Sequence, residues 1–77
     1  MARSPRSVTT LAWYRIRMHA AHRTVLQALA TGAEIDWPMG LRGSSQEHRR
    51  RAIVNTLERW GAINDGRITE IGRRLIG

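Results

Sequence analysis

The chain has 77 residues and a mass of 8.8 kDa, which limits it to one small domain and excludes a two-lobed enzyme or a fold built on a large sheet. It has no cysteine, so neither disulfides nor cysteine-ligated zinc can hold the domain together. Hydrophobic residues make up 42% of the chain, which is enough for one packed core.

The charge of the chain predicts an anionic partner. Thirteen basic residues against six acidic ones give a formal net charge of +7, and all thirteen are Arg. Nucleic acid, an anionic membrane surface or an acidic protein would each satisfy this field. The exclusive use of Arg has two explanations that can hold together. One is a GC-rich coding bias, and the other is recognition of phosphates and base edges, which a guanidinium binds in a bidentate way.

The sequence predicts a soluble, cytoplasmic protein with no membrane partner. It has no run of the roughly 18 apolar residues that a membrane span needs, and its N-terminus lacks the apolar run of a secretory signal. The first 23 residues hold five Arg and no acidic residue, as in an organelle transit peptide. The same segment also carries the periodicity of a core helix, which argues against a removable peptide.

Residues 1–8 are predicted to form a basic, flexible arm, and residues 9–77 one domain. The arm contains Arg3, Pro5 and Arg6 and has no apolar periodicity. Its two Arg could follow a DNA minor groove, as the arms of homeodomains do, or the segment could be disordered and without function.

A long amphipathic helix is predicted from residue 11 to residue 31. Thr9 or Thr10 would cap its start, and Gly32 would end it in a left-handed conformation. Apolar residues recur along it at steps of three and four, which places them on one buried face. These residues are Leu11, Tyr14, Met18, Ala21, Val25 and Leu29.

The next segment is predicted to contain short elements only. Residues 33–35 could form a very short strand, and Asp36, Trp37 and Pro38 have the pattern of a new helix start. Gly40 and Gly43 should restrict that helix to about one turn.

A basic helix is predicted over about residues 45–60. Ser44 and Glu47 form a capping-box pattern at its start, and Gly61 follows its end. The spacing of Ile53, Val54, Leu57 and Trp60 places these four residues on the core side of the helix.

A tight hairpin and a short final helix complete the chain. Asp65 and Gly66 between β-branched flanks predict a two-residue hairpin loop. Asn64 would then face Arg67, and Ile63 would face Ile68 with both isoleucines turned to the core. In the final helix we expect a Thr69 cap, buried Ile71 and Leu75, and an ion pair between Glu70 and Arg74.

The predicted fold class is therefore mainly α with a short β-hairpin. The run from Ile53 to Ile63, the Asn64-Asp65-Gly66 turn and the segment from Arg67 to Leu75 resemble the winged helix-turn-helix family of DNA-binding domains. The resemblance covers about half the chain. It implies three to four helices, a recognition helix over about residues 45–60 and a minimal β-wing.

The outer face of the basic helix is the main candidate for DNA contact. A helical projection places His48, Arg51, Asn55 and Arg59 opposite the core side, with Arg49 and Thr56 on one flank and Arg50 completing the run of three Arg. Arg to guanine and Asn to adenine are familiar base contacts in the major groove. An ordinary solvated helix face is the alternative, but three consecutive Arg near a helix N-terminus oppose the helix dipole and suggest another use.

Two further surfaces are predicted from the pattern. Asn64 and Arg67 lie on the outward face of the hairpin, where they could meet phosphate or the minor groove, or form a solvated turn. Trp13, Ile16 and Ala20 lie opposite the core stripe of the long helix. This apolar patch could pair two copies of the chain, bind another protein or be covered by neighbouring elements.

The sequence predicts no catalytic site, no metal site and no cofactor. It contains no nucleophile with a paired base, no Gly-rich phosphate loop and no carboxylate pair in a shared setting. His19 and His22 are three residues apart, but no third metal ligand is evident nearby.

The leading prediction is a non-enzymatic protein that binds double-stranded DNA, acts as a transcriptional regulator or architectural accessory factor, and forms a homodimer. Base reading would rest on Arg49, Arg51, Asn55 and Thr56, and Arg contacts to phosphate would supply most of the affinity. One alternative is a protein-binding module or small assembly subunit that uses the surface of Trp13 and Ile16. An RNA component ranks last, because single-strand recognition would need exposed aromatic platforms.

Overall fold

The computed structural model describes residues 8–77, with side chains from Leu11 onward. The predicted arm with Arg3 and Arg6 therefore lies outside the described residues, apart from Val8, which begins the first helix. The described part contains four α-helices, two 3-10 helices and one antiparallel hairpin. The elements are α1 (Val8–Arg17), α2 (Ala20–Thr31), η1 (Met39–Leu41), η2 (Ser44–Gln46), α3 (Glu47–Arg59), β1 (Ile63–Asn64), β2 (Arg67–Ile68) and α4 (Glu70–Ile76).

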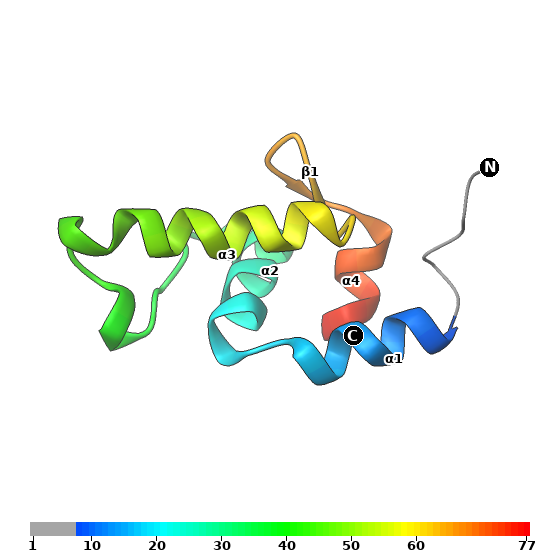
Figure 1. Ribbon diagram of the computed structural model, residues 1–77. Coiled ribbons are helices and arrows are strands. Elements are labelled where there is room, and N and C mark those ends of the chain that lie inside the picture. The colour runs from blue at the N-terminus through cyan, green and yellow to red at the C-terminus, as the bar shows by residue number, and fades with distance from the viewer. Residues whose placement is uncertain (1–7) are drawn as a thin grey trace.

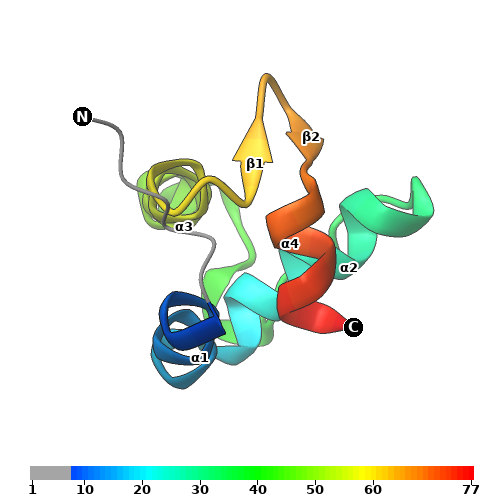
Figure 2. The same ribbon diagram turned by 90° about the vertical axis from the view of Figure 1, so that its right-hand side faces the viewer.

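The hairpin and α3 lie on one side of the molecule, and α1 lies on the opposite side. In Figure 1, α3 runs across the top with α2, α4 and α1 below it, and the β1–β2 hairpin rises above the level of α3. Figure 2 shows α4 between the hairpin and α1. The mainly helical fold with one short hairpin is thus confirmed.

The predicted continuous helix over residues 11–31 is wrong, because the helix breaks at Met18 and His19. His19 has extended backbone (φ −98°, ψ 172°), and its N–H donates to Nδ1 of His22 at 3.1 Å. This side-chain bond gives α2 a new start and competes with continuation of α1. Thr9 and Thr10 consequently lie inside α1, which begins at Val8, and do not cap it.

The predicted apolar stripe nevertheless reaches the core from both sides of the break. Leu11, Met18, Ala21 and Val25 are buried, while Tyr14 and Leu29 are half-buried. The four largest of the almost completely inaccessible side chains come from α2, α3 and α4. They are Val25, Leu26, Leu57 and Leu75.

The segment between α2 and α3 departs from the prediction in two places. Residues 33–35 form no strand, and the helix expected after Asp36 is the single 3-10 turn η1. The predicted capping box is also absent, because Ser44 lies in η2 and the N-cap of α3 is Gln46, which makes no side-chain cap bond. Gly43 (φ 97°) causes this change by accepting a bond from Gln46 N–H at 3.2 Å, which closes a 3-10 turn before α3.

The hairpin has the predicted register. Ile63 pairs with Ile68 and Asn64 pairs with Arg67. Both loop residues are left-handed, with φ of 56° at Asp65 and 77° at Gly66, which suits the right-handed twist of a two-residue hairpin. The isoleucines point inward as expected, since Ile63 is buried and Ile68 is half-buried.

The start of α4 joins the hairpin to the helical core. Thr69 Oγ1 accepts from Gly72 N–H at 3.2 Å, as predicted for an N-cap, and donates to the carbonyl of Gly61 at 2.5 Å. The expected Glu70–Arg74 ion pair is present at 2.9 Å. Gly72 packs so closely that an added Cβ would lie 2.5 Å from the Ala62 carbonyl oxygen.

Candidate nucleic-acid interface

The N-terminal half of α3 extends beyond the helical core. In Figure 1 the first turns of α3 pass to the left of α2, and the segment with η1 and η2 forms a loop below them. His48, Arg49 and Arg51 in these turns are all exposed. A basic helix end is therefore presented outside the main body of the domain.

Arg50 has a different position from its two Arg neighbours. Its side chain is half-buried, and Nη1 donates to the carbonyls of Leu41 and Gly43, both at 2.7 Å. Its guanidinium lies 5.9 Å from the centroid of the Trp37 ring. Arg50 thus fastens the loop beneath α3, so this predicted DNA contact already has partners within the fold.

The other α3 residues predicted to contact DNA differ in their exposure and in the bonds that they already make. Asn55 and Arg59 are exposed. Thr56 is half-buried, and its hydroxyl donates to the carbonyl of Ala52 at 3.0 Å. Arg51 lies 3.6 Å from the Glu47 carboxylate, but both side chains are largely solvated, so the pair is weak and Arg51 can exchange it for a phosphate.

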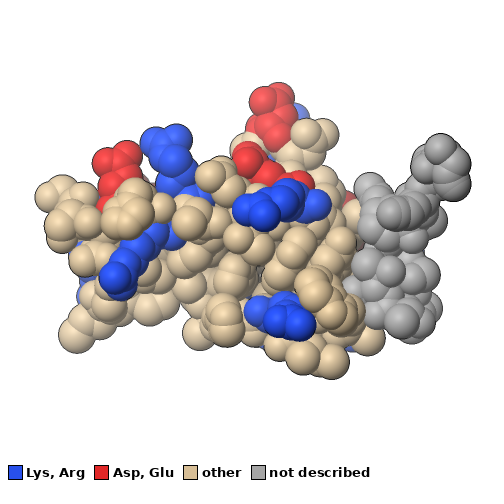
Figure 3. Space-filling model, viewed as in Figure 1, with Lys and Arg blue, Asp and Glu red and all other residues tan. Residues whose placement is uncertain are grey.

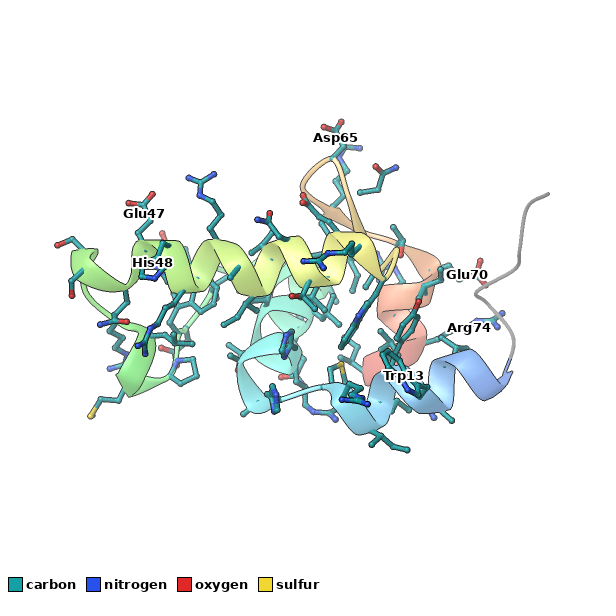
Figure 4. All side chains as sticks on the ribbon, viewed as in Figure 1. Trp13, Glu47, His48, Asp65, Glu70 and Arg74 are labelled. Carbon is teal, nitrogen blue, oxygen red and sulfur yellow. The ribbon has the colours of Figure 1, made fainter. Side chains whose placement is uncertain are left out.

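Acidic and basic side chains are not mixed evenly over this region. On the face shown in Figure 3, the acidic groups lie along the upper edge, where basic groups stand beside them, and further basic groups lie on the face below. Figure 4 shows Glu47 pointing upward from α3 and Asp65 at the tip of the hairpin. An anionic ligand on α3 would therefore meet Glu47 beside Arg51 at the upper edge and basic groups without acidic neighbours on the face below.

The hairpin brings Asn64 and Arg67 together as predicted. They are directly paired across the two strands, and both are exposed. Asp65 at the loop adds one negative charge beside them. The outward face of the hairpin accordingly carries one cation, one amide and one carboxylate, all accessible to solvent.

The predicted patch on the long helix is partly covered. Trp13 is 48% exposed and Ile16 is 80% exposed. The Trp13 ring lies edge to face with Tyr14 at 5.5 Å and with Trp60 at 6.4 Å between centroids. Ala20 is exposed but belongs to α2, so the helix break separates it from the other two residues.

Sequence reasoning missed Arg17 at this patch. Its guanidinium carbon lies 4.9 Å from the centroid of the Trp13 ring, which is a cation–π contact. The two residues are four apart on one helix, which is the spacing that brings side chains together, so the signal was present in the sequence.

A column of stacked rings joins three helices next to this patch. Tyr14 of α1 stacks on Trp60 at 4.8 Å, and Trp60 at the end of α3 stacks on His22 of α2 at 5.5 Å. Burial, with a smaller contribution from nearby His19, lowers the pKa of His22 below 6.5. The bond from the His19 N–H requires an unprotonated Nδ1 on His22, which the lowered pKa favours.

Two other features, a metal site and a membrane-spanning helix, were sought in the described part of the chain. Among residues 8–77 no group of three or more His, Asp or Glu side chains is placed so that it could hold a metal ion. None of the described helices combines the length and the apolar character that crossing a bilayer requires.

Comparison with protein-family models, with curated proteins and with solved structures finds no match to this chain. Its function therefore has to be inferred from its residues and its structure.

Proposed function

We propose that the chain is a winged-helix protein that binds double-stranded DNA, with α3 in the major groove and the hairpin as a minimal wing. Its role would be that of a transcriptional regulator or an architectural accessory factor. The observation that carries the proposal is the extension of α3 beyond the core with His48, Arg49 and Arg51 exposed. Donors near the N-terminus of such a helix are the ones that reach base edges.

The order of elements also supports a winged-helix assignment. A helix (α2), a turn region, a basic helix (α3), a hairpin and a closing helix (α4) follow one another in the order of that family. Here η1 and η2 take the place of the helix that usually precedes the recognition helix. Arg50 stabilises this shortened support through its two bonds to loop carbonyls.

The proposal divides the exposed residues into two roles. Arg49, Arg51 and Asn55 would read bases, whereas Arg59 and Arg67 would contact phosphates. Thr56 would contribute less than the sequence predicts, because its hydroxyl already bonds within the helix. Arg50 would be a positioning residue.

Duplex binding and its salt dependence test the proposal. We expect a random duplex to bind at low salt, and log K to fall by about 0.9 per phosphate contact for each unit of log salt concentration. The double variant Arg51→Ala with Asn55→Ala should lose preference among duplex sequences, while Arg67→Ala should mainly reduce the salt slope. Fluorescence anisotropy with labelled duplexes measures both.

Two results would contradict the proposal. Absence of duplex binding at low salt would remove DNA as the partner. Equal effects of the two changes on sequence preference and on salt slope would remove the division into base-reading and phosphate-binding residues.

A protein-binding module is the second candidate function. It is favoured by the exposure of Trp13 and Ile16 on one helix, at 48% and 80%. In that case the patch would be the active surface, and the basic residues would meet an acidic partner. The predicted homodimer through the same patch stays a prediction, which sizing of the free protein can check.

A further inference from the structure

Trp13 and Arg17 form a layered pair of planar groups at the surface of α1. The guanidinium of Arg17 lies 4.9 Å from the ring centroid, and almost half of Trp13 remains exposed. The ring is held from behind by edge contacts with Tyr14 and Trp60. Such a pair is both rigid and accessible, which a surface Trp without supporting rings would not be.

The charge around this pair favours an anionic occupant over a cationic one. Residues 8–33 contain no acidic residue, and Arg15, Arg17 and Arg23 are all exposed there. A second copy of the chain placed on the patch would bring these cations against each other. An anionic occupant is favoured instead, because Arg15, Arg17 and Arg23 give α1 and the start of α2 an excess of positive charge.

The exposed indole of Trp13 favours a nucleic acid strand over an acidic protein as the partner of this surface. An acidic protein would satisfy the Arg side chains but would make no special use of an exposed indole. A nucleotide supplies a phosphate for the cations and a flat base for the ring. Bases stack on aromatic rings and also on guanidinium planes, and both are present here in contact.

We propose that Trp13 and Arg17 form a stacking platform for an unpaired base of a single-stranded nucleic acid segment. A duplex hides the faces of its bases, so the platform selects strands that are open or frayed. This inference goes beyond the proposed duplex binding by α3 and shares with it only the class of partner.

The position of the platform is compatible with use alongside α3. Figure 4 shows Trp13 in front of α1 and His48 on the near side of α3. The contact between Trp13 and Trp60 joins the platform to the end of α3. In Figure 3 basic groups lie along this same face, so one nucleic acid could contact both places.

Binding of a labelled oligothymidine of about 15 nucleotides and of a blunt duplex of equal length tests the platform. We expect Trp13→Leu to weaken oligothymidine binding by about five- to tenfold, because one base loses its stacking partner. Trp13→Phe should retain most of the affinity, and the duplex affinity should not change. Ile16→Ala is the matched control, since it removes exposed apolar surface from the same helix without removing a ring.

Several outcomes overturn the platform. They are unchanged oligothymidine binding by Trp13→Leu, an equal loss with both nucleic acids, and an equal loss from Ile16→Ala. Competition by polyglutamate as effective as that by oligothymidine would identify the patch as a surface for an acidic protein. If the wild-type chain binds oligothymidine in a Trp13-dependent way but not the duplex, the platform stands and the proposed function of α3 fails.

A second pair of variants covers the case in which Trp13→Leu disturbs the fold. Arg17→Ala leaves the supporting ring cluster intact, and Arg23→Ala removes the same charge from α2. We expect Arg17→Ala to weaken oligothymidine binding more than Arg23→Ala does, because only Arg17 contacts the ring. Equal losses would mean that charge alone explains binding, which would overturn the platform.

Discussion

His22 is the residue whose chemistry depends most on the fold. It is 8% exposed, its Nδ1 accepts the His19 N–H, and its ring stacks on Trp60. The burial favours the neutral imidazole, and the accepted hydrogen bond requires it. Protonation would remove the acceptor and place a positive charge at the N-terminus of α2, where the helix dipole is unfavourable to cations.

The stability of the domain should therefore fall as the pH drops below 6.5, the ordinary pKa of His. The unfolded chain takes up a proton there, while the lowered pKa of His22 in the folded state resists protonation, so the unfolded state gains stability. Urea unfolding at about pH 8 and about pH 5 measures the difference in free energy. Well above 6.5 this contribution is constant, because His22 is then neutral in both states.

Two variants separate the contribution of His22 from that of His48. His22→Gln keeps an acceptor at the third helical position, as in a capping box, but cannot take up a proton in this range. It should reduce the loss of stability at low pH. Exposed His48→Gln should leave that loss unchanged, and the opposite pattern would refute the assignment to His22.

At the scale of elements, the junction of hairpin and α4 depends on one close contact. A Cβ on Gly72 would lie 2.5 Å from the Ala62 carbonyl oxygen and 2.7 Å from a side-chain carbon of Ile68. The backbone carbonyl of Ala62 cannot move away cheaply, and the Ile68 side chain would also have to shift. Gly72→Ala should therefore destabilise the domain by about 1–3 kcal/mol despite the better helix propensity of Ala.

Gly40→Ala is the matched control for this prediction. Nothing lies within 4 Å of the position of its added Cβ, so its effect should be within about 0.5 kcal/mol. Urea unfolding of both variants, fitted with one shared m-value, compares their free energies of unfolding. Similar stabilities of the two variants would show that the close contact does not constrain the junction.

Elements marked by a turn or cap pattern that nothing interrupts were predictable from the sequence, whereas two local bonds that interrupt such a pattern were not. The Asp65–Gly66 loop fixed the hairpin register, and Thr69 capped α4 as expected. The break before α2 depends on a side-chain bond that competes with a continuous helix, and apolar periodicity continues through it undisturbed. The lost capping box at Ser44 depends on the turn made by Gly43, which cap patterns do not reveal.

The candidate site was likewise only partly predictable from the sequence. Periodicity correctly predicted that His48, Arg51, Asn55 and Arg59 would be exposed. It could not show that Arg50 would be tied to Leu41 and Gly43, because that depends on how the loop folds beneath the helix.

At the scale of the whole molecule, Arg50 connects the extending half of α3 to the rest of the domain. Arg50→Ala should cost about 1–2 kcal/mol by removing its two carbonyl bonds. Amide hydrogen exchange should become faster over residues 33–46, while α2 and α4 keep their protection.

Arg49→Ala removes the same charge from an exposed neighbour and serves as the control. It should weaken DNA binding without accelerating exchange in residues 33–46. Faster exchange in both variants, or in neither, would mean that Arg50 does not hold this loop.

The column formed by Tyr14, Trp60 and His22 has a practical consequence. Its three rings belong to different helices, so their fixed mutual orientation exists only when α1, α2 and α3 are assembled. Near-ultraviolet circular dichroism detects such fixed aromatic surroundings, whereas far-ultraviolet signals persist in loosely packed states. The chain thus carries an intrinsic optical reporter of its tertiary assembly, with no need for an added label.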